Sequence, residues 1–166
     1  MKIIEYDAFL AIEYAKKWAK SRNPNYYDFS LIGGDCTNFC SQCLYSSCKV
    51  FNYTKNLGWY YISPTNRAPA FTGVEEFYTF LISNQNGVGD KSGPFAKEID
   101  LTDISVGDFI QLRRADFRFY HTLIVTDIKQ GVPLVSAHTF DALDKPLFNY
   151  SFEKLRCIKI LGARIP

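Results

Sequence analysis

The chain has 166 residues, a net charge of +2 and 47% hydrophobic residues. That length suits one compact core, so we expect residues 1–166 to form a single domain. The near-neutral charge, without a dense Lys/Arg block, argues against a nucleic-acid partner. No stretch approaches the roughly 20 apolar residues that a membrane span needs, and no signal peptide is recognisable. We expect a cytoplasmic protein as the chain is given, or a secreted or cell-envelope protein if the chain is a fragment.

The first half of the chain is predicted to be helical. Apolar residues recur at three- and four-residue intervals from Glu5 to Ser21, which predicts an amphipathic helix. Helical spacing resumes at residues 36–47 and again at residues 74–82. Residues 49–70 combine aromatic, Asn, Pro and Gly residues without a period, which indicates an irregular segment that walls a cleft. Residues 83–93 are predicted to be a loop.

The second half of the chain changes to β-branched and alternating patterns. Four segments between turn residues are predicted to be strands: 108–112, 119–128, 134–139 and 157–164. Short connections favour antiparallel neighbours, and the helices come first in the chain. We therefore expect an α+β fold in which N-terminal helices pack on a curved antiparallel sheet.

Residues 33–40, Gly-Gly-Asp-Cys-Thr-Asn-Phe-Cys, place a cysteine at the predicted start of the second helix. The glycine pair tolerates backbone angles that other residues resist, and Asp35 is the predicted N-cap. Unpaired N–H groups at a helix N-terminus favour a thiolate and can hold a developing oxyanion. Cys36 is therefore a candidate nucleophile.

A cysteine nucleophile needs a base, and the chain has two histidines, both in predicted strands. His121 shares one face of its strand with Leu123 and Val125, so we expect it to point toward the helices and meet Cys36. Imidazole is the side chain best suited to exchange protons near neutral pH. His121 is therefore the candidate general base.

His138 is the candidate third catalytic residue. If the hairpin register is centred between Lys129 and Gln130, His138 lies opposite His121 and orients it, whereas a slip of one residue turns it away. Asp141 is the competing orienting residue. The sequence does not decide between His138 and Asp141.

The oxyanion and the substrate also need partners. The backbone N–H of Cys36 is one natural oxyanion donor, and Tyr26 or Tyr27 could provide a second from a phenol. Trp59 is a candidate for lining the substrate cleft. Each of these aromatic residues is equally well explained by ordinary packing.

The cysteines allow a second interpretation. Cys36, Cys40 and Cys43 form a C-x3-C-x2-C spacing that could hold a metal or an iron–sulfur cluster, although packing of small apolar side chains explains the last two without a metal. The total of five cysteines is odd, which argues against a disulfide scaffold.

Several separated segments in the same order resemble the bacterial putative amidase domain family, which is related to the papain-like NlpC-type and CHAP-type amidases and peptidases. The segments are Tyr14-Ala15, Trp18, Arg22-Asn23-Pro24, Tyr26-Tyr27, residues 33–39, residues 41–44, Gly107-Asp108, His121-Thr122, residues 124–126, His138-Thr139 and Asp141. The resemblance implies a papain-like fold, with Cys36 as nucleophile, His121 as base and a polar third residue that falls best on His138.

The expected activity is that of a cysteine amidase or peptidase that forms a thioester with its substrate. Such chemistry needs no metal and no organic cofactor. The resemblance implies a peptide or peptidoglycan stem peptide as substrate. The alternative is a binding module that keeps the scaffold, recognises peptides or glycans, and no longer reacts.

Overall fold

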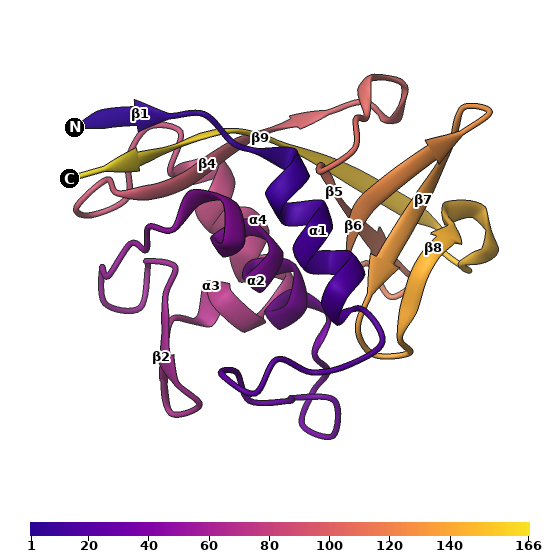
Figure 1. Cartoon of the computed structure of the whole chain (residues 1–166), viewed down its shortest axis with the longest axis horizontal. Helices are drawn as coiled ribbons and strands as arrows, with labels where there is room; N and C mark the ends of the chain where they lie inside the picture. Colours follow the sequence, from indigo (N-terminus) through magenta and orange to yellow (C-terminus); the bar gives the residue numbers. More distant parts are fainter.

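The computed structural model describes residues 1–166 as a group of helices packed on one face of a twisted sheet (Figure 1). The helices are α1 (Ala8–Trp18), α2 (Cys36–Cys48), α3 (Pro69–Thr72) and α4 (Val74–Ser83), with short 3-10 turns η1 (Leu101–Asp103) and η2 (Leu147–Asn149). The strands are β1 (Lys2–Ile4), β2 (Tyr61–Ser63), β3 (Asn66–Arg67), β4 (Gly93–Ile99), β5 (Phe109–Arg113), β6 (Phe119–Lys129), β7 (Val132–Ala137), β8 (Ala142–Pro146) and β9 (Lys154–Ile165).

The main sheet has seven strands in the order β1-β9-β5-β6-β7-β8, with β4 also paired to β9. Every neighbouring pair is antiparallel. Some residues of β9 pair with β4 and also with β1 or β5. The strand β4 therefore lies along one edge of β9, and β1 and β5 lie along the other edge. The predicted α+β order, with helices first and an antiparallel sheet after them, is confirmed.

The three predicted helices are confirmed with shifted bounds. Helix α1 begins at Ala8 because the side chain of Asp7 accepts hydrogen bonds from the N–H groups of Phe9 and Leu10. Helix α2 begins at Cys36, with Asp35 at the N-cap position as predicted. None of the helices is long and apolar enough to cross a lipid bilayer.

All four predicted strands are present, but several elements were missed. The strand β4 occupies Gly93–Ile99, where only a loop ending at Gly93 was predicted, because its mix of Gly, Pro, Lys and Glu hides the strand pattern. The strands β1 and β8 were also missed. They are only three and five residues long, and each pairs with a single neighbour in the main sheet. The segment expected to be irregular contains the small sheet β2-β3 and the short helix α3.

Both faces of the main sheet carry buried apolar residues. Phe109 of β5 and Ile124 of β6 belong to the larger cluster between the helices and the sheet. Their chain neighbours Ile110 and Leu123 belong to a smaller cluster on the opposite face, covered partly by Leu147 of η2. The sheet is therefore the central layer between two cores, as expected from the alternation of side chains along a strand.

Candidate active site

The N-terminus of α2 forms one wall of the candidate active site. Gly33 and Gly34 precede it with φ angles of +84° and +106°, a region that favours glycine, so the predicted need for glycine is confirmed. Cys36 is the first residue of α2 and is 7% exposed. The sulfur therefore lies at the end of the helix where backbone N–H groups are unpaired.

A cavity of about 420 Å³ joins Cys36 to His121. It is bordered by the glycine turn before α2, by the ends of β6 and β8, and by the segment after η2. Its lining residues are Gly33, Gly34, Cys36, Arg114, Tyr120, His121, Thr139, Phe140, Lys145, Asn149, Tyr150 and Ser151. The structure thus brings the predicted nucleophile and the predicted base to the same cavity.

His121 was predicted to point toward the helices, but it projects from the other face of the sheet. The hydroxyl oxygens of Thr122 and of Thr37 in α2 are 2.8 Å apart, so Thr122 is the residue that faces the helices. Leu123 and Val125 project from the same side of β6 as His121, and they lie in the cluster on the face of the sheet away from the helices. Because His121 lies near the beginning of β6, its ring still borders the cavity at the end of the sheet.

The imidazole of His121 is buried among aromatic rings. Its ring centroid lies 5.9 Å from that of Tyr120 and 5.7 Å from that of Tyr150. Burial, with a smaller contribution from the positive charges of Lys145 and Arg114, lowers the pKa of His121 to about 4. His121 is therefore an uncharged imidazole at neutral pH.

The thiol of Cys36 is also uncharged at neutral pH. Burial raises its pKa above the ordinary value, although hydrogen bonds from Thr122 and Thr37 oppose this effect. Desolvation therefore opposes the effect of the helix N-terminus, which favours the thiolate. A thiol beside a neutral imidazole can still react, provided that the proton moves as the sulfur attacks.

His138 does not contact His121 as the simple hairpin register predicted. The strand β7 ends at Ala137, and a register shift between Val125 and Asp127 displaces the pairing with β6. The Nδ1 atom of His138 lies 2.5 Å from Oδ2 of Asp35, and its Nε2 atom lies 2.8 Å from the carbonyl oxygen of Trp18. His138 is thus bound to the residue that directly precedes Cys36.

Asp35 occupies the N-cap position without capping the helix through its side chain. Its Oδ1 atom accepts hydrogen bonds from the backbone N–H of Phe29 and the side chain of Asn38. The backbone N–H of Asp35 donates to the hydroxyl of Thr139 at 2.8 Å. These bonds fix the chain immediately before the nucleophile.

Asp141, the competing orienting residue, is held by another partner. Its two carboxylate oxygens each accept a hydrogen bond of 2.9 Å from the guanidinium of Arg22. This bidentate pair ties the loop after α1 to the turn before β8. Neither His138 nor Asp141 therefore orients His121 in this structure.

The aromatic candidates do not line the cavity. Trp59 is fully buried in the larger core cluster, where its indole N–H donates to Ser41 of α2. Tyr26 stacks against Phe71, and burial raises its pKa to about 12. The backbone N–H of Tyr27 donates to Tyr61. In this structure, Trp59 packs in the core instead of lining the substrate cleft. Tyr26 and Tyr27, the candidate oxyanion donors, lie outside the lining of the cavity.

Sequence reasoning missed the residues that close the cavity on its other side. Arg114 follows β5, Tyr120 lies on β6, Lys145 lies on β8 and Tyr150 follows η2, and Phe140, which is 93% exposed, lies at the rim. No motif marks them, because their meeting depends on the pairing of β7 with β8. Only the two histidines and the cysteine carried a readable signal.

The C-x3-C-x2-C spacing does not form a metal site in this structure. Cys40 and Cys43 are fully buried in the core cluster, and all five cysteines are free. No group of three or more His, Cys, Asp or Glu side chains is arranged to hold a metal ion. The spacing of Cys40 and Cys43 places both side chains on the face of α2 that packs into the core.

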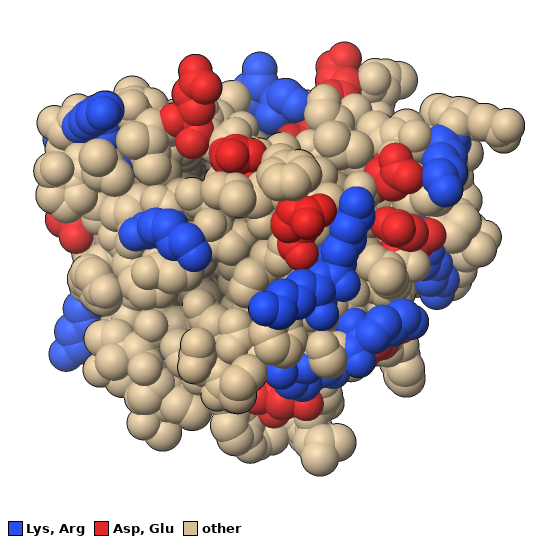
Figure 2. Space-filling model, viewed as in Figure 1, with Lys and Arg blue, Asp and Glu red and all other residues tan.

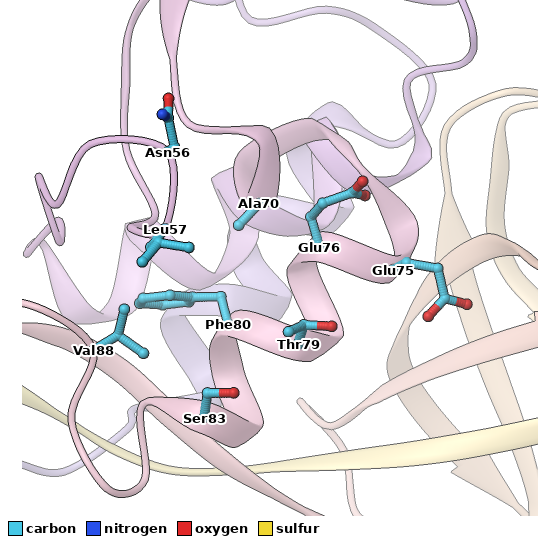
Figure 3. Close-up of a pocket in the computed structure, with 9 residues that line it drawn as sticks. All are labelled: Asn56, Leu57, Ala70, Glu75, Glu76, Thr79, Phe80, Ser83 and Val88. Atoms are coloured by element: carbon cyan, nitrogen blue, oxygen red, sulfur yellow. The ribbon is translucent and has the colours of Figure 1, made fainter.

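A second cavity, of about 450 Å³, lies beside α4 (Figure 3). The side chains of Leu57, Ala70, Phe80 and Val88 converge to form an apolar floor, and Thr79 lies along α4 beside it. This cavity has neither a cysteine nor a histidine in its lining. Of the two cavities, the one at the start of α2 is therefore the one lined by a cysteine and a histidine.

A family model described as "Putative amidase domain" matches residues 5–160. The chain belongs to this family. The amidase-domain match covers both Cys36 and His121, and it indicates a hydrolase that acts on amide bonds.

A similar protein is the uncharacterized protein YhbB of Bacillus subtilis (strain 168). It is 31% identical over 143 residues, which represent 85% of this chain and 44% of YhbB. The amidase domain described by the structure therefore spans less than half the length of this curated relative. No solved structure matches the chain.

Proposed function

We propose that this amidase domain is a cysteine hydrolase that cleaves an amide bond in a peptide or a peptidoglycan stem peptide, on a papain-like scaffold formed by residues 1–166. The supporting observation is that Cys36, at the N-terminus of α2, and His121 border one cavity. Cys36 is the proposed nucleophile and His121 the proposed base.

In the proposed reaction, the Cys36 thiol and the His121 imidazole both begin uncharged. As the sulfur attacks the amide carbonyl, the thiol proton moves to His121 and a carbon–sulfur bond forms. The carbonyl oxygen becomes an oxyanion, for which the backbone N–H at the start of α2 is the proposed donor. The carbon–nitrogen bond then breaks, and His121 gives the proton to the departing amine.

Hydrolysis of the thioester returns the enzyme to its starting state. His121 accepts a proton from water as the water oxygen attacks the acyl carbon. The carbon–sulfur bond breaks, the carboxylic acid leaves, and the sulfur regains a proton. The residues that carry these steps require no metal and no organic cofactor.

His138 is proposed as a positioning residue rather than as the third member of a triad. It acts through Asp35, whose backbone leads directly into Cys36 and whose carboxylate it contacts. Fixing the backbone before the nucleophile also fixes the orientation of the N–H groups at the helix start.

The first test measures turnover of peptide and muropeptide substrates by Cys36→Ala, His121→Ala and Cys40→Ala. Cys40→Ala is the matched control, because Cys40 lies one turn further along α2 in the core. We expect no turnover for Cys36→Ala and a loss of about 10²- to 10⁴-fold for His121→Ala. Turnover by Cys36→Ala at the wild-type rate would overturn the assignment of the nucleophile.

A second measurement tests the thioester directly. Wild-type enzyme quenched in acid during turnover should carry the mass of an acyl group on the peptide that contains Cys36, as located by mass spectrometry. Cys36→Ser should instead retain the acyl group longer, because an ester replaces the thioester. Absence of acylation at Cys36 during measurable turnover would contradict covalent catalysis.

The binding module remains a second candidate, because the pKa of Cys36 is raised and that of His121 is lowered. A module of this kind would bind the peptides that the enzyme cleaves, with equal affinity in wild type and Cys36→Ala, and without any product. Iodoacetamide labelling of Cys36 across pH, with His121→Ala alongside, distinguishes the two. A labelling rate that depends on His121 supports the enzyme.

A further inference from the structure

We propose that the substrate carries a carboxylate close to the scissile amide, and that Arg114 and Lys145 bind this carboxylate. This inference rests on the proposed function, because it assigns a substrate class to the same cavity. Peptides with an acidic side chain or a free C-terminal carboxylate next to the cleaved bond belong to this class.

The first observation is the charge of the cavity. Arg114 and Lys145 both line it, and no Asp or Glu is among its lining residues. A cleft lined by one sign of charge attracts ligands of the opposite charge. Here Lys145 is half-buried and Arg114 is exposed. The cavity of the proposed nucleophile is thus positively charged.

The second observation is that these two cations have no carboxylate partner. Salt bridges in this molecule involve Arg22, Lys129, Arg156 and Lys159, and most of the 19 Lys and Arg residues form none. Arg114 instead lies over the ring of Tyr120, 4.1 Å from its centroid, and Lys145 lies 3.9 Å from the centroid of Tyr150. Stacking on a ring face positions a cation and leaves its N–H groups available to an anion.

The carboxylates close to these cations in the chain lie outside the lining of the cavity. Asp116 follows Arg114 by two residues and accepts the backbone N–H of Arg118. Asp144, the neighbour of Lys145, accepts a hydrogen bond of 2.6 Å from the hydroxyl of Thr126. Neither forms a salt bridge with Arg114 or Lys145.

The third observation concerns Tyr150, one of the residues that line the cavity. Its hydroxyl oxygen is buried and has no hydrogen-bond partner, and burial raises the pKa of this phenol to about 12. A buried donor without a partner is costly, and a bound ligand can supply the missing acceptor. Tyr150 thus offers a neutral O–H donor in the wall of the cavity.

A bound carboxylate would also act on the proposed base. The charges of Lys145 and Arg114 contribute to the lowered pKa of His121. An anion between them offsets that contribution, so the imidazole becomes a stronger base when the correct substrate is bound. A neutral peptide of the same shape does not produce this effect.

One face of the molecule carries charges of both signs. On the face shown in Figure 2, basic and acidic side chains are interspersed over α1, and the area over β2 carries few charges. This face therefore presents no patch of one sign to a charged ligand.

The experiment compares four peptides that share one scissile amide. One pair has glutamate or glutamine beside that bond, and the other pair has a free or an amidated C-terminus next to it. We expect wild type to prefer the charged member of at least one pair by about 10- to 100-fold in kcat/KM, as for a hydrogen bond to a charged group. The pair that responds identifies the source of the carboxylate.

The variants Arg114→Gln, Lys145→Gln and the double variant should reduce this preference stepwise toward one. Lys16→Gln is the matched control, because it removes one charge from the exposed side of α1, outside the cavity. The preference should also fall as NaCl is raised, since salt screens charges. Equal kcat/KM for charged and neutral peptides in wild type would overturn the proposal, as would an unchanged preference in the double variant.

A binding measurement separates this inference from the proposed function. Calorimetry with Cys36→Ala, which cannot turn over, should show tighter binding of the charged peptide, and this difference should vanish when Arg114 and Lys145 are also replaced. If the difference is found but no amide is cleaved by wild type, the proposed function fails and the inference stands. If wild type cleaves both members of each pair equally and Cys36→Ala binds them equally, the inference fails and the proposed function stands.

Discussion

At the scale of single residues, the molecule holds two reactive side chains in their uncharged forms. Cys36 and His121 are each 7% exposed, and burial raises the pKa of the first and lowers that of the second. Because burial disfavours the protonated form of His121, we expect the folded protein to lose stability in acid.

His121 is predicted to make the fold sensitive to acid. Its pKa is about 4 in the folded protein and about 6.5 in an unfolded chain, so between these values only the unfolded chain binds the proton. Stability therefore falls as pH decreases through this window, by about 3 kcal/mol at pH 4. Urea unfolding of wild type and His121→Gln at pH 7 and pH 4 measures this loss. The carboxylates titrate in both proteins, so the difference between the two losses reports His121. Equal losses in the two proteins would contradict the burial argument.

His138 is predicted to contribute to stability as well as to activity. His138→Phe keeps the stacking on Phe39, whose ring centroid lies 4.1 Å away, but leaves Oδ2 of the buried Asp35 without its 2.5 Å partner. We expect the free energy of unfolding to fall by about 3 kcal/mol. His138→Gln, which can still donate to Asp35, should lose less. A His138→Phe variant as stable as wild type would show that the pair does not stabilise the fold.

The sequence predicted the residues of the site better than their contacts. Cys36 and His121 could be recognised because few residue types perform this chemistry and the chain has only two histidines. The partner of His138 could not be predicted, because one irregularity in the pairing of β6 with β7 decides which way its ring points. Lys145 and Arg114 carry no signal in the sequence at all.

At the scale of elements, helix boundaries depend on single hydrogen bonds. The amphipathic pattern located α1, but the cap at Asp7 determined its first residue. The strand β4 escaped prediction because a strand at the edge of a sheet needs no regular apolar pattern when its partner supplies the register. Long central elements with buried residues were predictable, and short edge strands were not.

The N-cap of α1 gives a prediction at this scale. Asp7→Ala removes the acceptor for the N–H groups of Phe9 and Leu10, at 3.0 Å and 3.4 Å. We expect a loss of about 1 kcal/mol in the free energy of unfolding, because the cap is exposed and water replaces part of the bond. Asp7→Asn, which keeps an acceptor, is the control and should remain within about 0.5 kcal/mol of wild type. Urea unfolding at neutral pH measures both.

At the scale of the whole molecule, the central sheet joins two apolar clusters. Ile124 of β6 belongs to the cluster under the helices, and Leu147 of η2 belongs to the cluster on the other face. Because both clusters are attached to the same hydrogen-bonded strands, neither face can lose its order without disturbing the sheet. The proposal of a single domain over residues 1–166 follows from this arrangement.

Two core variants test this proposal. We expect Ile124→Val to cost about 1 kcal/mol and Leu147→Ala about 3 kcal/mol. The double variant should lose the sum within about 0.5 kcal/mol, since the two side chains share no cluster. All three variants should unfold in one cooperative transition, followed by circular dichroism and by tryptophan fluorescence. Two separate transitions would contradict the single domain.

The two chain ends meet in the strand pair formed by β1 and β9, where Lys2 is paired with Ile165. In Figure 1 they lie side by side, on the opposite side of the molecule from the β7-β8 hairpin that borders the candidate active site. A short peptide could therefore connect Pro166 to Met1, and new ends could be opened at the Gln130-Gly131 turn. For the same reason, this unit could be inserted into a surface loop of an unrelated host protein with its candidate active-site cavity facing away from the junction.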